Sequence, residues 1–293
     1  MHTTLISTDL VAEHLVDSSW LIVDCRYNLN DERWGQGEYE AAHIPGAVFV
    51  DVAHDLAAER SGSNGRHPLP TVEAMAATFG RLGVADNIQV VAYDQDAGAF
   101  ASRLWWMLRY LGHDAVAVLD GGFAKWTRER RPVRGGRETR QPARFTARLR
   151  PEMRVTVDET LAHLGDPSVL LVDARSPDRY AGKPDPLDRI YGHIPGARNR
   201  YYRHNVTEAG TMRSASELKA DFEKVLADTP PNHAVMYCGS GITACHNLLA
   251  MEQAGLHGAR LFAGSWSEWE SDPKRPVETS STADDREDRR NRE

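Results

Sequence analysis

The sequence predicts an α/β protein with two tandem domains, each a mostly parallel central sheet flanked by helices on both faces. Two observations predict this fold. Short apolar runs alternate with amphipathic helical patterns along the chain, which is typical of parallel strands joined by crossover helices. The same series of segments also occurs twice in the same order, so one half repeats the other. The 293 residues are enough for two domains of ordinary size.

Four matched pairs of segments define the repeat. In each half, a strand-like run ends in Asp-x-Arg, a His-Ile-Pro-Gly-Ala segment follows, and two further apolar runs come later. A repeat of this length indicates two similar domains rather than a solenoid of short units. The pairs are 20–26 with 169–175, 43–47 with 193–197, 90–94 with 234–238, and 118–126 with 261–269.

Amphipathic patterns between the apolar runs predict the helices. Several of them begin after Ser or Thr, the residues that most often cap a helix N-terminus. The carboxyl ends of parallel strands then meet at one edge of each sheet, where function is expected. The predicted helices cover 7–16, 72–82, 102–111, 156–164, 216–227 and 244–253.

The composition of the intervening segments sets the predicted boundaries. Residues 128–154 are rich in Arg, with Gly and Pro, and predict an extended, solvated linker; a basic anion-binding patch is the alternative. Residues 277–293 are strongly charged and almost free of apolar side chains, so we expect a disordered tail. We therefore expect an N-terminal domain over 1–135, a linker over 136–153 and a C-terminal domain over 154–276.

Overall charge and cysteine content exclude several classes of protein. The net charge of −7 gives no electrostatic support for nucleic-acid binding. No apolar run approaches the roughly 20 residues of a membrane-spanning helix, and the N-terminus does not read as a secretory signal. The three cysteines fit neither a disulfide framework nor a zinc site, and they suit a reducing compartment. We expect a cytoplasmic protein.

Cys238 is the most informative residue of the chain. The apolar run 234–237 leads it into the loop 238–243 (CGSGIT), and the predicted helix 244–253 follows. Unsatisfied N–H groups in such a loop, together with the helix dipole, stabilise a thiolate. The alternative is a buried structural cysteine, the usual fate of a free thiol. Glycines on either side of Ser240 favour a reactive sulfur without covering side chains.

These segments together resemble the two-domain rhodanese family of sulfurtransferases, from about residue 7 to residue 276. The resemblance rests on 39–47 (YEAAHIPGA), on 262–269 (FAGSWSEW) and above all on the Cys238 loop. This loop looks like the 3-mercaptopyruvate branch of the family. In the thiosulfate branch basic residues typically follow the cysteine, where this chain has Gly239 and Ser240.

The resemblance implies transfer of a sulfane sulfur through a Cys238 persulfide. Sulfur would move from 3-mercaptopyruvate to Cys238 with release of pyruvate, and then to a thiol, thioredoxin or cyanide, as two half-reactions. The implied protein is a monomer that needs no cofactor and no metal, and binds neither nucleic acid nor membrane. The loop residues implied to hold the sulfur and substrate are Gly239, Gly241, Ile242 and Thr243.

Two arginines of the second half are the implied ligands of the substrate carboxylate and ketone. They are Arg179 and Arg189, both between the Asp-x-Arg strand end and His193. A planar guanidinium binds such oxygens in a bidentate way. The alternative is a surface ion pair with Asp178 or Asp188.

The resemblance also implies a relay of Asp, His and Ser. Ser240 is its last member and His67 matches the histidine. The acid does not transfer cleanly, because Ala53 stands where it is expected, and Asp55 is the possible substitute. His67 as a residue that merely holds its loop is the alternative.

Three further residues lie near these motifs. Cys245 is expected to pack in its helix, the alternative being a resolving thiol. Cys25 is expected to be inert. Asp94 takes the place of the nucleophile in the first half, so that domain is expected to be non-catalytic.

Three rival functions remain to be compared. A cysteine phosphatase of this fold requires an Arg six residues after the cysteine, and Ala244 stands there. A thiosulfate:cyanide sulfurtransferase would prefer positive charge beside the sulfur, which Gly239 and Ser240 do not supply. A non-catalytic persulfide carrier or redox-sensing module would not need Arg179 and Arg189 as a clamp for a substrate carboxylate.

Overall fold

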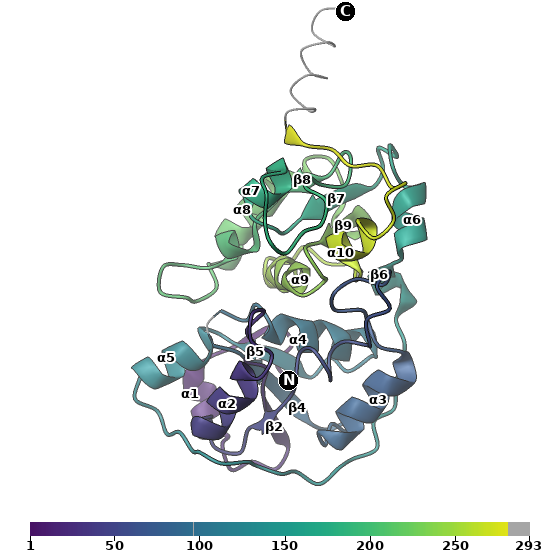
Figure 1. Ribbon diagram of the computed structural model, residues 1–293. Coiled ribbons are helices and arrows are strands. Elements are labelled where there is room, and N and C mark those ends of the chain that lie inside the picture. The colour runs from purple at the N-terminus through teal and green to yellow at the C-terminus, as the bar shows by residue number, and fades with distance from the viewer. Residues whose placement is uncertain (96, 281–293) are drawn as a thin grey trace, which may run out of the picture. The chain divides into compact units, whose positions relative to one another are not determined.

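The computed structural model describes residues 1–95 and 97–280, which form two compact units (Figure 1). The first unit comprises 1–59, 69–151 and 205–215; the second comprises 60–68, 152–204 and the described residues from 216 onward. The predicted division was a single break within a linker. It differs from the structure because 60–68 belong with the second unit and 205–215 with the first.

The sheet of the first unit has five parallel strands in the order β1-β5-β4-β2-β3. Two of its helices begin as expected after hydroxyl residues, since Ser7 caps α1 and Thr71 caps α3 through their side chains. The elements are β1 (Leu5–Ile6), α1 (Thr8–Glu13), β2 (Trp20–Asp24), α2 (Trp34–Ala41), β3 (Val48–Phe49), α3 (Val72–Arg81), β4 (Gln89–Tyr93), α4 (Ala101–Tyr110), β5 (Val116–Leu119) and α5 (Gly122–Arg128).

Both faces of this sheet are covered by helices. Every residue of β4 is buried. Val91 and Tyr93 pack in one cluster with Val11 of α1 and Trp126 of α5, whereas α4 contacts β4 and β5. Since side chains alternate along a strand, a strand buried on both faces is the pattern of a parallel sheet between two helical layers.

The second unit repeats this sheet with the order β6-β10-β9-β7-β8, again all parallel. Thr156 and Glu159 form a capping box at the start of α6. The predicted α/β class with mostly parallel sheets is confirmed. The elements are β6 (Arg154–Val155), α6 (Val157–Ala162), β7 (Leu170–Asp173), α7 (Pro177–Ala181), β8 (Arg198–Asn199), α8 (Ala215–Leu226), β9 (Ala234–Tyr237), α9 (Thr243–Gln253), β10 (Arg260–Phe262) and α10 (Ser265–Trp269), with 3-10 turns at Pro151–Met153, Tyr202–Asn205 and Pro231–His233.

The Asp-x-Arg motif makes the same buried ion pair in both units. In the second, Arg175 Nη2 lies 2.7 Å from Asp173 Oδ2 and donates to the carbonyl of Gly192 over 2.7 Å. Burial opposes the charge of Arg175, but Asp173 and its neighbours raise the guanidinium pKa. In the first unit Arg26 and Asp24 form the equivalent pair at 2.7 Å. The motif therefore fixes the carboxyl ends of β2 and β7.

The structure shows where the predicted linker and the first residues of the predicted tail lie. Residues 136–150 run along the first unit, bonded through backbone groups such as Ala143 N to Gly80 O over 2.8 Å. The predicted boundary at 276 is wrong by a few residues, because Glu278 is buried, pairs with His193, and accepts from Gly196 N over 2.9 Å. A backbone pairing holds it there despite its charge. The rest of the predicted tail, 281–293, lies outside the described residues.

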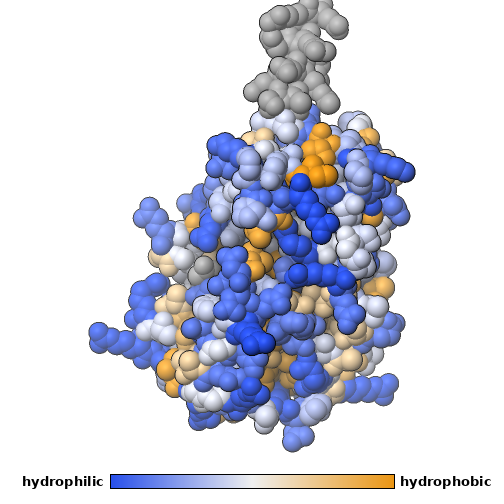
Figure 2. All heavy atoms as spheres, viewed as in Figure 1, coloured by the Kyte–Doolittle hydropathy of each residue, from blue (hydrophilic) through white to orange (hydrophobic). Residues whose placement is uncertain are grey.

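Hydrophilic side chains cover most of the face seen in Figure 2, with apolar ones in small separate patches. Within the described residues, no helix has the length and apolar character needed to cross a membrane.

Candidate active site

Cys238 lies at the carboxyl end of β9, in the loop that leads into α9. All four residues of β9 are buried, so the strand holds the start of the loop rigidly. The N–H of Gly241 donates to Cys238 Sγ over 3.1 Å. The N-terminus of α9 follows at Thr243, and its dipole adds positive potential beside the sulfur. A backbone donor and the start of a helix thus lie beside the sulfur.

Gly241 is required by the shape of this loop. Its φ is +79°, and a Cβ atom at this position would lie 2.0 Å from the carbonyl oxygen of Ala263. Any side chain would therefore push the loop away from the segment after β10. The two remaining implied loop residues lie where the sequence placed them: Ile242 is buried before α9, and Thr243 is its first residue.

The start of α10 fixes the other side of the loop. Ser265 Oγ accepts from the N–H of Cys238 over 3.0 Å, and Trp266 N donates to the Cys238 carbonyl over 3.0 Å. Ser267 N donates to the carbonyl of Gly239 over 3.0 Å. Ser265 itself has a φ of +56°, uncommon outside glycine. Sequence reasoning identified the 262–269 segment but missed that its serines hold the nucleophile loop.

The predicted openness of Cys238 is wrong: the residue is 2% exposed. The glycines do leave space, but long cationic side chains occupy it. A Cβ atom on Gly239 would lie 2.8 Å from Arg66 Nη2 and 3.0 Å from Arg179 Nη2. The reactive loop therefore lies beside two guanidinium groups. Sequence reasoning missed Arg66, although it adjoins His67.

Arg179 approaches the loop from α7 and is held by a buried carboxylate. Its Nε donates to Asp188 Oδ2 over 2.8 Å and its Nη2 donates to Asp188 Oδ1. The Asp188 side chain is only 2% exposed, and Arg175 Nη1 lies 3.3 Å from it. The ion pair with Asp188 exists, but it is not a surface pair. It aims the Arg179 guanidinium at the Cys238 loop.

Arg189 lies on the wall of a cavity of about 280 Å³ within the second unit. Its side chain is exposed, while its backbone N–H donates to Glu270 Oε2 over 2.8 Å. Arg66 also lines this cavity, as do Asp188 and Ser267. The structure thus joins Arg189 to the site through the cavity that Arg66 shares.

Ser240 and His67 contact each other, although they are far apart in sequence. His67 Nδ1 lies 2.8 Å from Ser240 Oγ, and both residues are buried. Residues 60–68 belong to the second unit, so this contact is internal to that unit. The possible acid of the implied relay, Asp55, has other partners. Its carboxylate is bound by Arg81 and by the backbone N–H of Asp51. Ala53, at the position where the acid was expected, has no carboxylate.

The two other cysteines lie in packed environments. Cys245 Sγ, one turn into α9, lies 3.3 Å from the carbonyl of Gly241 and the residue is fully buried. Cys25 is fully buried too, and burial raises its pKa well above the ordinary thiol value. Both placements agree with inert packing.

Asp94 shows what the same loop does in the first unit. Its carboxylate accepts from the N–H groups of Gly98, Phe100 and Ala101, over 2.9, 2.7 and 3.1 Å. The loop after β4 thus folds around a fixed negative group at the position matching Cys238. This supports the expectation that the loop shape suits an anion.

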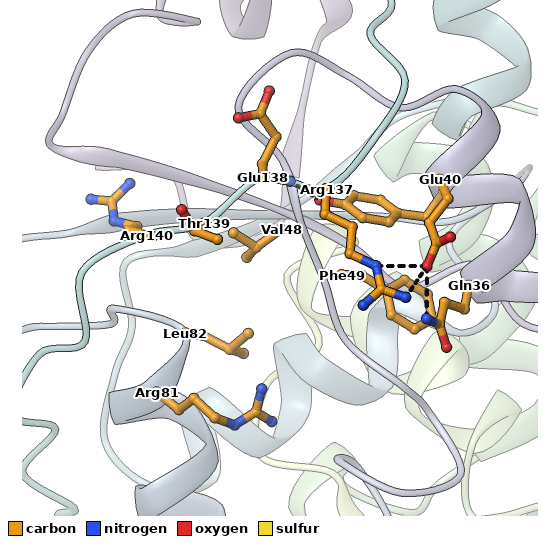
Figure 3. A pocket seen from close by; sticks show the side chains of 11 residues that line it. Gln36, Glu40, Val48, Phe49, Arg81, Leu82, Arg137, Glu138, Thr139 and Arg140 are labelled. Atoms are coloured by element: carbon orange, nitrogen blue, oxygen red, sulfur yellow. Dashed lines mark hydrogen bonds and ion pairs between the residues drawn. The ribbon is translucent and has the colours of Figure 1, made fainter.

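A further cavity, of about 360 Å³, lies in the first unit (Figure 3). Glu40 binds Arg137 over 2.5 Å and Gln36 over 2.7 Å at its rim. Its described lining residues include no cysteine, serine or histidine.

Comparisons with known proteins agree with this geometry. The rhodanese-like domain model matches residues 7–129 and 156–272. The chain is 40% identical to a probable 3-mercaptopyruvate sulfurtransferase of Pseudomonas aeruginosa, over 94% of this chain and 98% of that protein. It is 37% identical to a putative thiosulfate sulfurtransferase of Mycobacterium tuberculosis, over 87% of this chain and 89% of that protein.

A solved structure gives the same result. The 3-mercaptopyruvate sulfurtransferase from Leishmania major superposes with a TM-score of 0.84 at 32% identity, covering 97% of this chain and 78% of that one. The duplicated parallel sheets, the cysteine loop after β9 and these similarities lead to one conclusion: the chain belongs to the family of proteins with rhodanese-like domains, with one such domain in each half.

Proposed function

We propose that this protein is a sulfurtransferase that takes sulfur from 3-mercaptopyruvate through a persulfide on Cys238. The observation that carries the proposal is the cysteine loop with a guanidinium beside it. Gly241 N–H lies 3.1 Å from Cys238 Sγ, and Arg179 Nη2 lies next to Gly239. A nucleophilic sulfur and a guanidinium that can bind the carboxylate of the donor thus lie at the same loop.

In the first half-reaction the Cys238 thiolate attacks the sulfur of the donor. An S–S bond forms and the C–S bond of the donor breaks. Its electron pair passes to the carbon, so pyruvate leaves as an enolate that then takes up a proton. The Cys238 sulfur is oxidised to a persulfide and the donor carbon is reduced. Covalent catalysis of this kind divides one difficult transfer into two easier ones.

Arg179 is the proposed ligand of the donor carboxylate and ketone. Its guanidinium is already oriented by Asp188, so little conformational freedom is lost when an anion binds. Arg189 is the second proposed ligand, from the wall of the adjoining cavity. Gly239, Gly241, Ile242 and Thr243 supply the loop backbone that holds the thiolate and then the persulfide. A carrier module that receives sulfur from another protein would not need this clamp.

Ser240 and His67 form the proposed proton path for the leaving enolate. A hydrogen bond of 2.8 Å allows His67 to receive or return the proton of the Ser240 hydroxyl. Asp55 takes no part in this proposal because Arg81 binds its carboxylate. The pair acts without the acid of the relay.

We expect Ser240→Ala and His67→Gln each to lower kcat with mercaptopyruvate by about 10²-fold, the lower end of the range for general acid–base catalysis. The double variant should lose no more than either single variant, because the two residues act as one unit. Steady-state pyruvate release measures this. Losses that multiply in the double variant would instead indicate two independent roles, and would contradict the proton path.

In the second half-reaction the persulfide gives its outer sulfur to an acceptor. We propose a small thiol, thioredoxin or cyanide, and a monomeric enzyme acting in the cytoplasm. A chain with three cysteines and no disulfide framework in its sequence pattern suits a reducing compartment. The second half-reaction restores the Cys238 thiolate, so the kinetics should be ping-pong.

Pyruvate release in a single turnover tests the proposed function. Without an acceptor, the protein should release about one pyruvate per active site and then stop, because the persulfide cannot be discharged. Adding cyanide should restart turnover and form thiocyanate. A protein that releases no pyruvate from mercaptopyruvate would contradict the proposal. If such a protein still forms thiocyanate from thiosulfate, the rival donor would be favoured.

A further inference from the structure

Arg66 is fixed to the nucleophile loop through its backbone. Its N–H donates to Ser267 Oγ over 2.9 Å, and its carbonyl accepts from Arg60 Nε over 2.8 Å. Ser267 in turn donates its own N–H to the Gly239 carbonyl over 3.0 Å. One residue of α10 therefore sets the position of both Arg66 and the loop.

Burial of the Arg66 guanidinium removes water from its positive charge, which costs free energy. Burial lowers its pKa, and the neighbouring charge of Arg179 lowers it further, against the opposing effects of Asp188, Glu270 and Cys238. Its side chain is 24% exposed, and its nearest carboxylate oxygen in Asp188 is 3.8 Å away. Asp188 is already bound by Arg179, so this carboxylate compensates Arg66 only in part.

The hydrogen-bonding capacity of Arg66 is not fully used. Nη1 donates to the carbonyl of Leu187. Within the described residues, Nε is buried and has no hydrogen-bond partner. A buried donor without a partner costs free energy, and an anion would relieve that cost.

Two guanidinium groups from elsewhere in the chain lie beside Gly239, the residue that follows Cys238. A side chain at position 239 would meet Arg66 Nη2 at 2.8 Å and Arg179 Nη2 at 3.0 Å. Gly239 and Ser240 are neutral, and the cations expected at the site from the sequence were Arg179 and Arg189. The structure places two guanidinium groups there, one of them from residues 60–68.

We propose that Arg66 is a donor-binding residue that, together with Arg179, lets the site accept a dianionic sulfur donor such as thiosulfate. This inference rests on the proposed function, since it needs the Cys238 persulfide. The Cys238 thiolate attacks the sulfane sulfur, an S–S bond to Cys238 forms, and the S–S bond of thiosulfate breaks. Sulfite leaves with the electron pair, and charge is conserved.

Arg66 favours the dianion because Coulomb attraction scales with ligand charge. Mercaptopyruvate carries one negative charge, which Arg179 can balance beside the Cys238 loop; Arg189, the second proposed ligand, lies on the wall of the adjoining cavity. Thiosulfate carries two, and needs a second cation at the same place. Arg66 therefore selects between donors and contributes less to the chemical step with mercaptopyruvate.

The test compares R66Q with R66K, using cyanide as acceptor and each donor in turn. Gln keeps a polar side chain but has no charge, whereas Lys keeps the charge. We expect R66Q to lower kcat/KM for thiosulfate at least 10-fold more than for mercaptopyruvate. R66K should keep the ratio of the two kcat/KM values within about 3-fold of that of the unmodified protein. This ratio does not depend on the folded fraction of the sample, so partial unfolding cannot imitate the result.

Two outcomes would overturn this inference and can be told apart from failure of the proposed function. Equal losses with both donors in R66Q would indicate a purely structural role for Arg66. Unchanged kcat/KM values with both donors in R66Q would show that Arg66 takes no part in donor binding. If instead the unmodified protein forms a persulfide from neither donor, the proposed function itself is contradicted, and the inference falls with it.

Discussion

Cys238→Ser should abolish sulfur transfer from mercaptopyruvate while leaving the fold intact. A serine hydroxyl is far less acidic than a thiol and cannot form a persulfide, so no covalent intermediate is available. We expect kcat to fall by at least about 10⁴-fold, as when a covalent nucleophile is removed. Pyruvate release in steady state and in a single turnover measures the loss.

Cys245→Ser is the matched control for this variant. Cys245 is also buried and lies on the same loop and helix, since its Sγ contacts the Gly241 carbonyl. It should retain most of the activity if it only packs within α9. Substantial turnover by Cys238→Ser, or equal loss in both variants, would show that the nucleophile is assigned wrongly.

Arg179→Ala should lower kcat/KM for mercaptopyruvate by about 10- to 150-fold. This corresponds to the roughly 1.5–3 kcal/mol expected for hydrogen bonds to a charged group. Most of the effect should appear in KM if the clamp binds substrate and transition state equally, and in kcat if it acts mainly on the developing enolate. Initial rates over a range of donor concentrations separate the two.

Two controls distinguish loss of the clamp from loss of structure. Arg179→Ala also leaves the buried carboxylate of Asp188 without its closest partner, so Arg179→Ala with Asp188→Asn removes that unpaired charge. Lys183 forms an exposed ion pair with Asp178, and Lys183→Ala should leave kcat/KM unchanged. Unchanged turnover in Arg179→Ala would exclude the clamp.

The fold could be predicted from the sequence because its signals are local and repeated. Alternating apolar runs and capped helices gave the parallel sheets, and the Asp-x-Arg segments at 24–26 and 173–175 marked equivalent strand ends in both halves. The boundaries were less accurate, because the assignment of 60–68 to the second unit depends on contacts distant in sequence, such as Arg66 with Ser267.

The site could be predicted only in part. Cys238 and its loop were identifiable because a strand-like run precedes the cysteine, and two glycines and a helical pattern come after it. Arg179, identified from the resemblance, lies at that loop, and the predicted contact between His67 and Ser240 is present at 2.8 Å. Arg66 and Ser265 were missed, because no local pattern indicates that a side chain will cover a distant loop. The expected openness of the sulfur failed for the same reason.

The most direct test of the account is the location of the transferred sulfur. The protein is treated with mercaptopyruvate without an acceptor, digested and analysed by mass spectrometry with fragmentation. Fragmentation is needed because no Lys or Arg lies between Lys224 and Arg260, so trypsin leaves Cys238 and Cys245 on one peptide. The account predicts one added sulfur atom on Cys238. An added sulfur on Cys25 or Cys245, or none at all after pyruvate has been released, would contradict it.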